Sequence, residues 1–166
     1  VARTTTDGRT TARTGPGDPP VGFARHTGPA GLVTVLPSSF TVSEGANAGT
    51  AVAKDQRDPE VEVRFGGAAP EGYGGLFETI AEAARGTAAA RPGYRQLALA
   101  RTGHGGRDAV DWEFEYETPQ GEPRRSRSHY WRSGGIEYVL LAQAPPQRWA
   151  EASRLLDTMI DHCYTP

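Results

Sequence analysis

The stretch Ala109-Val110-Asp111-Trp112-Glu113-Phe114-Glu115-Tyr116-Glu117 alternates strictly between apolar and acidic side chains. Successive side chains of a β-strand point to opposite faces, so this period of two predicts a half-buried strand over residues 109–117. The inward-facing set consists of large apolar residues: Val110, Trp112, Phe114 and Tyr116. The opposite set is acidic, and we expect it to be solvated: Asp111, Glu113, Glu115 and Glu117.

A hairpin follows this strand. A turn rich in proline and glycine, residues 118–123, leads into a second strand-like run, Arg124–Arg132. Centring the turn on Gly121 places basic residues opposite acidic ones in three cross-strand pairs: Glu117 with Arg125, Glu115 with Arg127, and Glu113 with His129. The same register predicts that Trp112 and Tyr130 face each other on the buried side.

The remaining pattern predicts an α+β fold, an antiparallel β-sheet flanked by helices. Short strand-like runs separated by turn residues come first: Val21–His26, Leu32–Leu36, Phe40–Val42, Thr50–Ala53 and Val61–Phe65. An amphipathic stripe predicts a helix from Gly75 to about Ala90. The run Ile136–Ala144 is apolar on both faces and predicts a central strand. A last helix is predicted to carry six residues on one face: Trp149, Ala152, Leu156, Met159, Ile160 and Cys163.

Composition limits the domain organisation and the class of partner. The first 20 residues are rich in threonine, proline and glycine and lack large apolar side chains, which predicts a disordered linker before a single domain over residues 21–166. The net charge of -2 argues against a nucleic-acid partner. No apolar run has the length of a membrane span, so any membrane anchor is expected upstream of this chain. The single cysteine, Cys163, excludes an intramolecular disulfide; whether it is buried or forms an intermolecular disulfide stays open.

No motif joins a nucleophile to a base. His104 lies in the glycine-rich stretch of residues 103–108, which is more typical of a surface turn than of a general base. Glu113 and Glu115 could serve as hydrolase carboxylates, but the arginines opposite them indicate a solvated charge ladder. Glu113 with His129 supplies too few ligands for zinc. We therefore expect no catalytic residue, cofactor or metal, and a hydrolase using His104 or the carboxylate row is the alternative.

Trp131 is the large aromatic residue that the predicted register turns towards the charged face. An exposed tryptophan beside guanidinium groups is typical of a contact site for a partner. We nevertheless favour cover of Trp131 by a helix or a neighbouring strand over exposure. The candidate contact residues on this face and in the nearby glycine-rich turn are Trp131, Arg125, Arg127 and His104.

Four motifs resemble a known family. They are Gly31–Pro37, Gly106–Phe114 with its Trp-Glu-Phe strand, the Gly-x-x-Tyr strand at Gly135–Tyr138, and Pro145 followed by Trp149 at the last helix. Together they resemble actinobacterial extracytoplasmic domains found C-terminal to membrane-spanning serine/threonine protein kinases and in related lipoproteins. The resemblance covers roughly residues 21–164. The chain departs from it where Cys163 and Tyr164 stand in place of the usual phenylalanine.

The resemblance implies a PsbP-like α/β/α sandwich. It also implies a non-catalytic sensor or ligand-binding domain outside the cytoplasm, tethered at the cell surface through an upstream anchor that this chain lacks. The resemblance implies that the partner is a small molecule, a cell-wall component or a protein. It implies no catalytic residues and no cofactor. A structural self-association domain is the remaining alternative.

Overall fold

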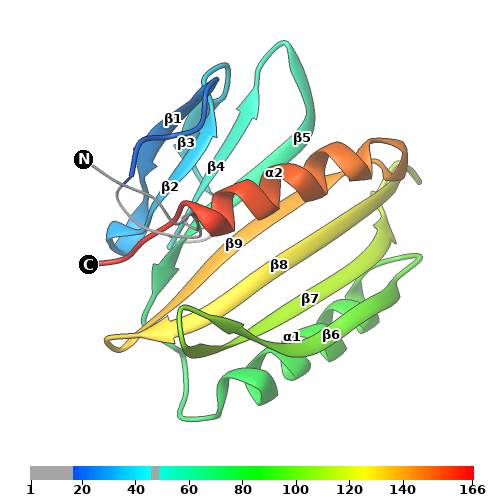
Figure 1. Ribbon diagram of the computed structural model, residues 1–166. Coiled ribbons are helices and arrows are strands. Elements are labelled where there is room, and N and C mark those ends of the chain that lie inside the picture. The colour runs from blue at the N-terminus through cyan, green and yellow to red at the C-terminus, as the bar shows by residue number, and fades with distance from the viewer. Residues whose placement is uncertain (1–16, 46–48) are drawn as a thin grey trace.

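The computed structural model describes residues 17–45 and 49–166 (Figure 1). These residues form β1 (Phe23–Thr27), β2 (Val33–Pro37), β3 (Thr41–Glu44), β4 (Thr50–Asp55), β5 (Asp58–Ala68), α1 (Leu76–Ala90), β6 (Arg95–His104), β7 (Arg107–Glu117), β8 (Pro123–Ser133), β9 (Ile136–Ala144) and α2 (Trp149–Asp161). Residues 1–16 of the predicted linker lie outside the described part. Neither α1 nor α2 has the length and hydrophobicity needed to cross a membrane, and the described residues contain no other α-helix.

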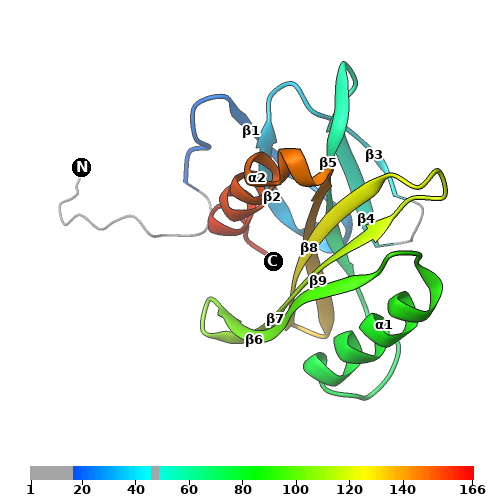
Figure 2. The ribbon, with the colours of Figure 1, turned by 90° about the vertical axis from the view of Figure 1, so that its right-hand side faces the viewer.

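The strands form one large sheet and one separate hairpin. The large sheet is antiparallel with the order β3-β4-β5-β9-β8-β7-β6, and β1 pairs only with β2. In the edge-on view, α1 lies on one side of the sheet, while α2 and the β1–β2 hairpin lie on the other (Figure 2). This arrangement confirms the predicted α+β sandwich.

Each face of the sheet buries its own core. On the α1 face, Trp112 and Phe114 of β7 pack with Ile80 and Ala84 of α1, which confirms the inward face predicted from the alternation. On the α2 face, a larger core is built from β2, β4, β5, β9 and α2. Its fully buried side chains include Leu36, Val63, Phe65, Leu140, Leu156 and Met159. Both faces of the central strands are therefore packed against other elements and at least partly shielded from solvent.

The edge strand β6 was not predicted from the sequence. His104, expected in a surface turn, is instead the last residue of this strand. A two-residue turn follows, in which Gly105 and Gly106 have φ values of +56° and +82°. Two successive positive φ angles are what a type I′ hairpin turn requires, and glycine adopts them without strain. The Gly-Gly pair was therefore the sequence signal for a hairpin here.

The β7–β8 hairpin has a register two residues away from the predicted one. The observed cross-strand pairs are Glu115 with Arg125, Glu113 with Arg127, and Asp111 with His129, and Val110 rather than Trp112 lies opposite Tyr130. The reason is the loop, which two backbone hydrogen bonds of 2.8 Å close: Thr118 N–H donates to the Glu122 carbonyl, and Gly121 N–H donates to the Thr118 carbonyl. The hairpin is thus centred on Gln120. A register shift of two residues keeps every side chain on its predicted face of the sheet but changes the residue opposite it on the neighbouring strand.

The charged face of β7 and β8 is partly covered, whereas the sequence predicted a solvated ladder. The side chains of Glu113 and Arg127 are each only 18% exposed. The cover is α2, which packs on β9, the neighbour of β8, through its apolar side. Its polar edge then reaches β8, where Arg127 binds Asp157 of α2 at 2.9 Å.

Candidate functional site

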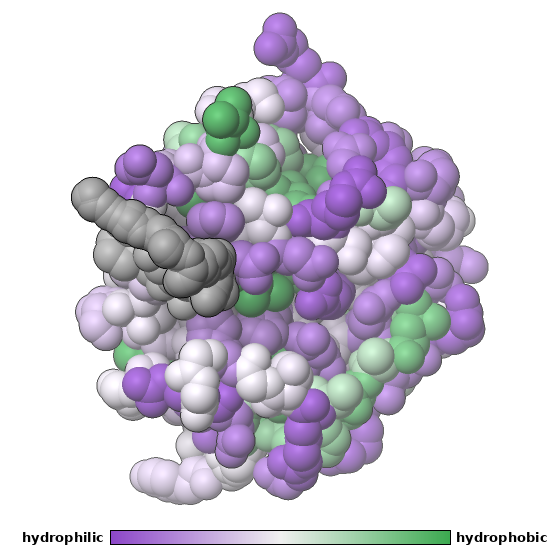
Figure 3. Space-filling model, in the orientation of Figure 1, coloured by the Kyte–Doolittle hydropathy of each residue, from purple (hydrophilic) through white to green (hydrophobic). Residues whose placement is uncertain are grey.

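A cavity of about 460 Å³ opens between the β1–β2 hairpin, the β4–β5 turn and α2. Its apolar lining comes from five segments: Phe23, Pro37, Phe40, Val61 and Leu155. In the space-filling view, hydrophobic surface is visible inside a hollow near the top of the molecule, framed by hydrophilic residues (Figure 3). An apolar hollow of this volume with a few polar groups at its edge is the usual form of a small-molecule site.

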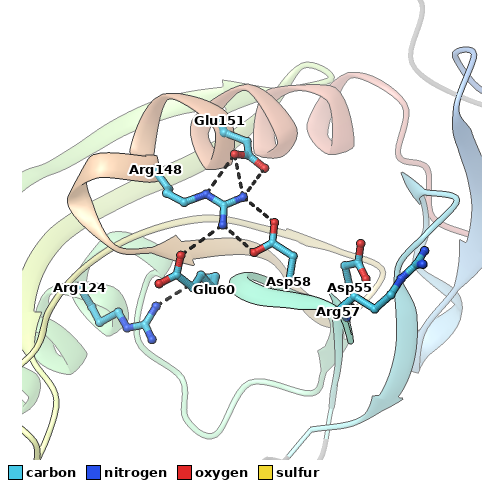
Figure 4. A network of polar contacts seen from close by, with 7 residues as sticks. All are labelled: Asp55, Arg57, Asp58, Glu60, Arg124, Arg148 and Glu151. Carbon is cyan, nitrogen blue, oxygen red and sulfur yellow. Dashed lines mark hydrogen bonds and ion pairs between the residues drawn. The ribbon is translucent and has the colours of Figure 1, made fainter.

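The polar rim is organised by Arg148, which lies immediately before α2 (Figure 4). Its guanidinium binds the Asp58 carboxylate in a fork, with Nη1 donating to Oδ1 at 2.7 Å and Nη2 to Oδ2 at 2.9 Å. The same group donates to Glu60 Oε1 at 3.2 Å and to both oxygens of Glu151. These hydrogen bonds hold the pKa of Asp58 below its usual value and raise the pKa of Arg148.

The rim carries more negative than positive charge. The lining includes three carboxylates, Asp55, Asp58 and Glu151, and two guanidinium groups, Arg148 and Arg154. Beside the cavity, Glu60 adds a fourth carboxylate, and Arg124, which donates to the Glu60 carbonyl at 3.2 Å, adds a third guanidinium. The side chains of Asp58, Glu60 and Glu151 are each about half exposed, at 50%, 52% and 53%. Four carboxylates and three guanidinium groups thus surround the cavity, so a net negative charge remains at the rim.

This rim was not predicted from the sequence. Arg148 and Glu151 are three residues apart across the start of α2, a spacing that local reasoning can recognise as an ion pair. Asp58 and Glu60 are 90 and 88 residues away from Arg148 along the chain. They reach it because β5 pairs with β9 and α2 then folds back over that pair.

A second polar cluster lies at the other end of α2, where four side chains form a line of contacts. Asp111 Oδ1 is 2.7 Å from His129 Nδ1, and His129 Nε2 is 3.0 Å from His104 Nδ1. His104 Nε2 is 3.7 Å from the sulfur of Cys163, which follows α2. His129 is 4% exposed and Cys163 is 1% exposed, whereas Asp111 and His104 are half-buried.

The chemistry of this cluster does not favour nucleophilic catalysis. Burial raises the pKa of the Cys163 thiol to about 12, so the thiol stays protonated at neutral pH. The thiolate is the nucleophilic form of cysteine, and reactive cysteines are exposed with a lowered pKa. Burial also lowers the pKa of His104 to about 4, with smaller contributions from His129 and Arg107. A buried thiol beside a neutral imidazole lacks both the charge and the access that attack on a substrate needs.

The predicted contact residues gather under α2, and none of them lines the cavity. Trp131 is 1% exposed, with its ring stacked on His104 at 3.9 Å between centroids. The interpretation of Trp131 as an exposed contact is therefore wrong, and the covered alternative is correct. Arg125 binds Glu113 and lies 5.0 Å above the Trp149 ring. Partner contact by Arg125, Arg127 and His104 stays a prediction.

The carboxylates along β7 bind arginines and do not pair with one another. Glu113 binds Arg125, and Glu115 binds Arg95 of β6 at 2.6 Å. Hydrolysis by two carboxylates requires them to face one substrate, with one of them protonated. In the described part of the chain, no group of three or more His, Cys, Asp or Glu side chains is arranged to hold a metal ion.

Several solved structures share this fold at low sequence identity. Cyanobacterial PsbP (CyanoP) from Synechocystis sp. PCC 6803 superposes with a TM-score of 0.67 at 11% identity, covering 98% of each chain. LpqN of Mycobacterium tuberculosis gives 0.58 at 13% identity over 87% of this chain and 92% of LpqN. The Saccharomyces cerevisiae Ran-binding protein Mog1p gives 0.56 at 12% identity, over 81% and 89%. The fold is therefore PsbP-like.

Sequence comparison identifies the family more narrowly than the fold does. No curated protein shows significant similarity to this chain. Residues 24–165, which span the domain from β1 to the segment after α2, match the family described as the serine/threonine kinase C-terminal domain. The match covers most of the chain, so the chain belongs to the family of serine/threonine kinase C-terminal domains.

Proposed function

We propose that this domain is the non-catalytic, extracytoplasmic ligand-binding part of a membrane-anchored serine/threonine kinase, and that the cavity beside Arg148 is its binding site. One observation carries the proposal: a cavity of about 460 Å³ with an apolar lining and a charged rim. Membership of a kinase C-terminal family supports the link to a kinase. LpqN, described as involved in cell envelope biogenesis, has the same fold, which is compatible with a place at the cell envelope.

The rim selects the charge of the ligand. Arg148 already binds three carboxylates, so an anionic ligand would have to pair with Arg154 instead and would meet those carboxylates at the rim. A cationic group on the ligand would instead pair with Asp58 or Glu151, whose side chains are half exposed. We propose that the ligand is a small molecule, or the end of a peptide, that has an apolar body and a primary amine or guanidinium group.

Three small probes of similar shape and different charge test this proposal. Phenethylamine is cationic, phenylacetate anionic and phenylethanol neutral at neutral pH. We expect phenethylamine to bind saturably and phenylacetate to bind about tenfold more weakly or worse, since that factor corresponds to about 1.4 kcal/mol of charge repulsion. Ligand-observed NMR at low salt is the measurement, because salt weakens exposed charge interactions.

A matched pair of variants controls for location. Ser38 and Ser39 are neighbouring exposed residues after β2, but only Ser39 lines the cavity. Ser39→Trp should fill the mouth and abolish phenethylamine binding, while Ser38→Trp should leave it unchanged. Equal binding in both variants, or equal binding of phenylacetate and phenethylamine, would show that the cavity or its charge has been misassigned.

Absence of catalysis is a separate prediction. The purified domain should give no turnover in a broad screen for esterase, phosphatase, glycosidase and peptidase activity, because its one thiol is protonated and the Glu113 and Glu115 carboxylates are bound by arginines. The screen is repeated with His104→Ala. Turnover in the wild type that disappears in the variant would overturn the non-catalytic assignment.

A further inference from the structure

A smaller cavity, of about 250 Å³, lies on the α1 face of the sheet, whereas the cavity beside Arg148 lies on the α2 face. Its lining comes from the neighbouring strands β5, β9, β8 and β7 and from the residue that follows α1. The apolar walls are Phe114, Tyr116 and Leu141. The polar lining side chains are Arg64, Arg91, Ser126 and Gln143. The lining therefore contains two guanidinium groups and no carboxylate.

A small residue on β8 provides the space for this cavity. Ser126 lies opposite Phe114 of β7 on one side and opposite Gln143 of β9 on the other. α1 packs mainly on β7 and β6, so the side chains of Arg64, Leu141 and Gln143 on the neighbouring strands are only half-buried. A serine between larger side chains, next to the end of a helix, leaves a hollow that is open to a ligand.

Ser126 supplies a buried hydroxyl without a partner. The residue is 2% exposed, and its hydroxyl makes no hydrogen bond to any residue in the described part of the chain. Buried polar groups are normally hydrogen-bonded. Because Ser126 lines the cavity, a ligand oxygen inside the cavity can accept the hydrogen bond that the protein does not.

Arg91 supplies a guanidinium that no carboxylate neutralises. Its Cζ lies 4.7 Å from the centre of the Tyr116 ring, in a cation–π contact. Among residues 17–45 and 49–166, no Asp or Glu forms an ion pair with Arg91, although the Glu117 carboxylate lies close to Gly93, two residues further along the chain. The contact with the Tyr116 ring positions the guanidinium at the cavity and leaves its N–H groups free to donate to a ligand.

The carboxylate at the edge of the cavity, Glu62, already has partners. Arg64 donates from Nε to Glu62 Oε2 at 3.0 Å, and Gln143 donates from Nε2 to the same oxygen at 2.9 Å. Lys54 Nζ is 3.8 Å from Glu62 Oε1. The terminal nitrogens of Arg64 make no hydrogen bond to a described residue. Three positive charges, those of Lys54, Arg64 and Arg91, thus surround one negative charge, and the excess at this cavity is positive.

We propose that Arg64, Arg91 and Ser126 form a second binding site, which takes the phosphate group of a phosphate monoester. The three terminal oxygens of such a group can accept from two guanidinium groups and a hydroxyl at once, whereas one guanidinium already satisfies both oxygens of a carboxylate. The cavity volume equals that of about eight water molecules at roughly 30 Å³ each, so a phosphate and a short organic group against Phe114 and Leu141 fit. This site does not depend on the cavity beside Arg148.

A ¹H–¹⁵N NMR titration with methyl phosphate tests the site. The measurement is made at low salt and above about pH 7, where a phosphate monoester, with a second pKa of about 6, is mainly a dianion. We expect saturable shifts confined to the amides around the cavity, including those of Arg64, Arg91 and Ser126. Ser39→Trp, which fills the other cavity, should leave these shifts unchanged.

Two matched pairs of variants locate the binding. Arg91→Gln should weaken methyl phosphate binding about tenfold or more, while Arg85→Gln should not change it, because Arg85 binds Glu82 and does not line the cavity. Ser126→Ala should also weaken binding about tenfold, while Ser128→Ala, at the next position on the same face of β8, should not. The Arg91 and Arg85 side chains are both exposed, so these two variants should fold even if a serine variant does not.

Two further probes define the chemical class. Acetate, which has only two oxygens, and dimethyl phosphate, which carries a single charge, should each bind at least about tenfold more weakly than methyl phosphate. Binding of dimethyl phosphate as tight as that of methyl phosphate would assign the site to phosphodiesters and overturn the proposal. The absence of saturable shifts with methyl phosphate, or equal affinity in Arg91→Gln and Arg85→Gln, would overturn it as well.

Discussion

Replacing Trp131 by alanine should destabilise the domain by about 3–5 kcal/mol, the usual cost of truncating a buried tryptophan. Its indole is 1% exposed and lies between the rings of His104 and Tyr138. Marginal domains have only about 5–15 kcal/mol of stability in total, so the variant should melt about 10 °C or more below the wild type. Urea unfolding followed by circular dichroism measures the difference.

The His104 ring provides a specific readout for the same variant. Without the stacked indole, His104 is more exposed, and its pKa of about 4 should rise towards 6.5. Tyr73→Ala is the control, because Tyr73 is fully exposed and its loss should change stability little. A stability of Trp131→Ala within about 0.5 kcal/mol of the wild type, the usual range of surface substitutions, would contradict the burial of this residue.

Trp112→Ala should be about equally destabilising, by ~3–5 kcal/mol, because Trp112 anchors the other core. It is 6% exposed, packs with Phe114 and the α1 residues, and donates from Nε1 to the Tyr94 hydroxyl at 3.1 Å. We expect little soluble protein, and a large loss of stability in the fraction that folds. Differential scanning calorimetry and soluble yield are the measurements.

Trp112→Phe separates packing from hydrogen bonding. The phenyl ring keeps much of the buried area but loses the donor to Tyr94, so the cost should be clearly smaller, about 1–2 kcal/mol. If the alanine variant were as stable as the phenylalanine variant, Trp112 would not be a core anchor, and the face assigned to β7 would be inverted.

The β7 strand could be predicted because its information is local. Four apolar and four acidic side chains in alternation define the strand and its buried face without reference to the rest of the chain. β6 was not predicted because an edge strand buries little of its surface, and every residue of Arg95–His104 is exposed or half-buried. Its only strong local signal was the Gly105-Gly106 turn.

The histidine cluster was not predicted, because the predicted register of the β7–β8 hairpin was wrong by two residues. The predicted register placed His129 opposite Glu113, where the cross-strand pairing suggested a simple charge ladder. The observed register places it opposite Asp111, next to His104. Cys163 is 59 residues beyond His104 and reaches it only through the packing of α2. Turn closure by backbone hydrogen bonds set this register, and composition alone does not determine that closure.

The cavity could not be predicted, because its walls come from segments far apart in the sequence. Phe23 and Thr158 lie at opposite ends of the domain, and both line it. Each of these residues has an ordinary local role in a strand, a turn or a helix. Their convergence depends on the β5–β9 pairing and on the return of α2 across the sheet.

A two-dimensional ¹H–¹⁵N NMR titration of the domain with phenethylamine tests whether a cationic ligand binds in the cavity beside Arg148. We expect saturable shifts confined to the amides around the cavity, including Ser39, Asp58, Arg148 and Leu155, and their loss in Ser39→Trp. Saturable shifts elsewhere on the molecule, or none at all, would contradict binding in this cavity.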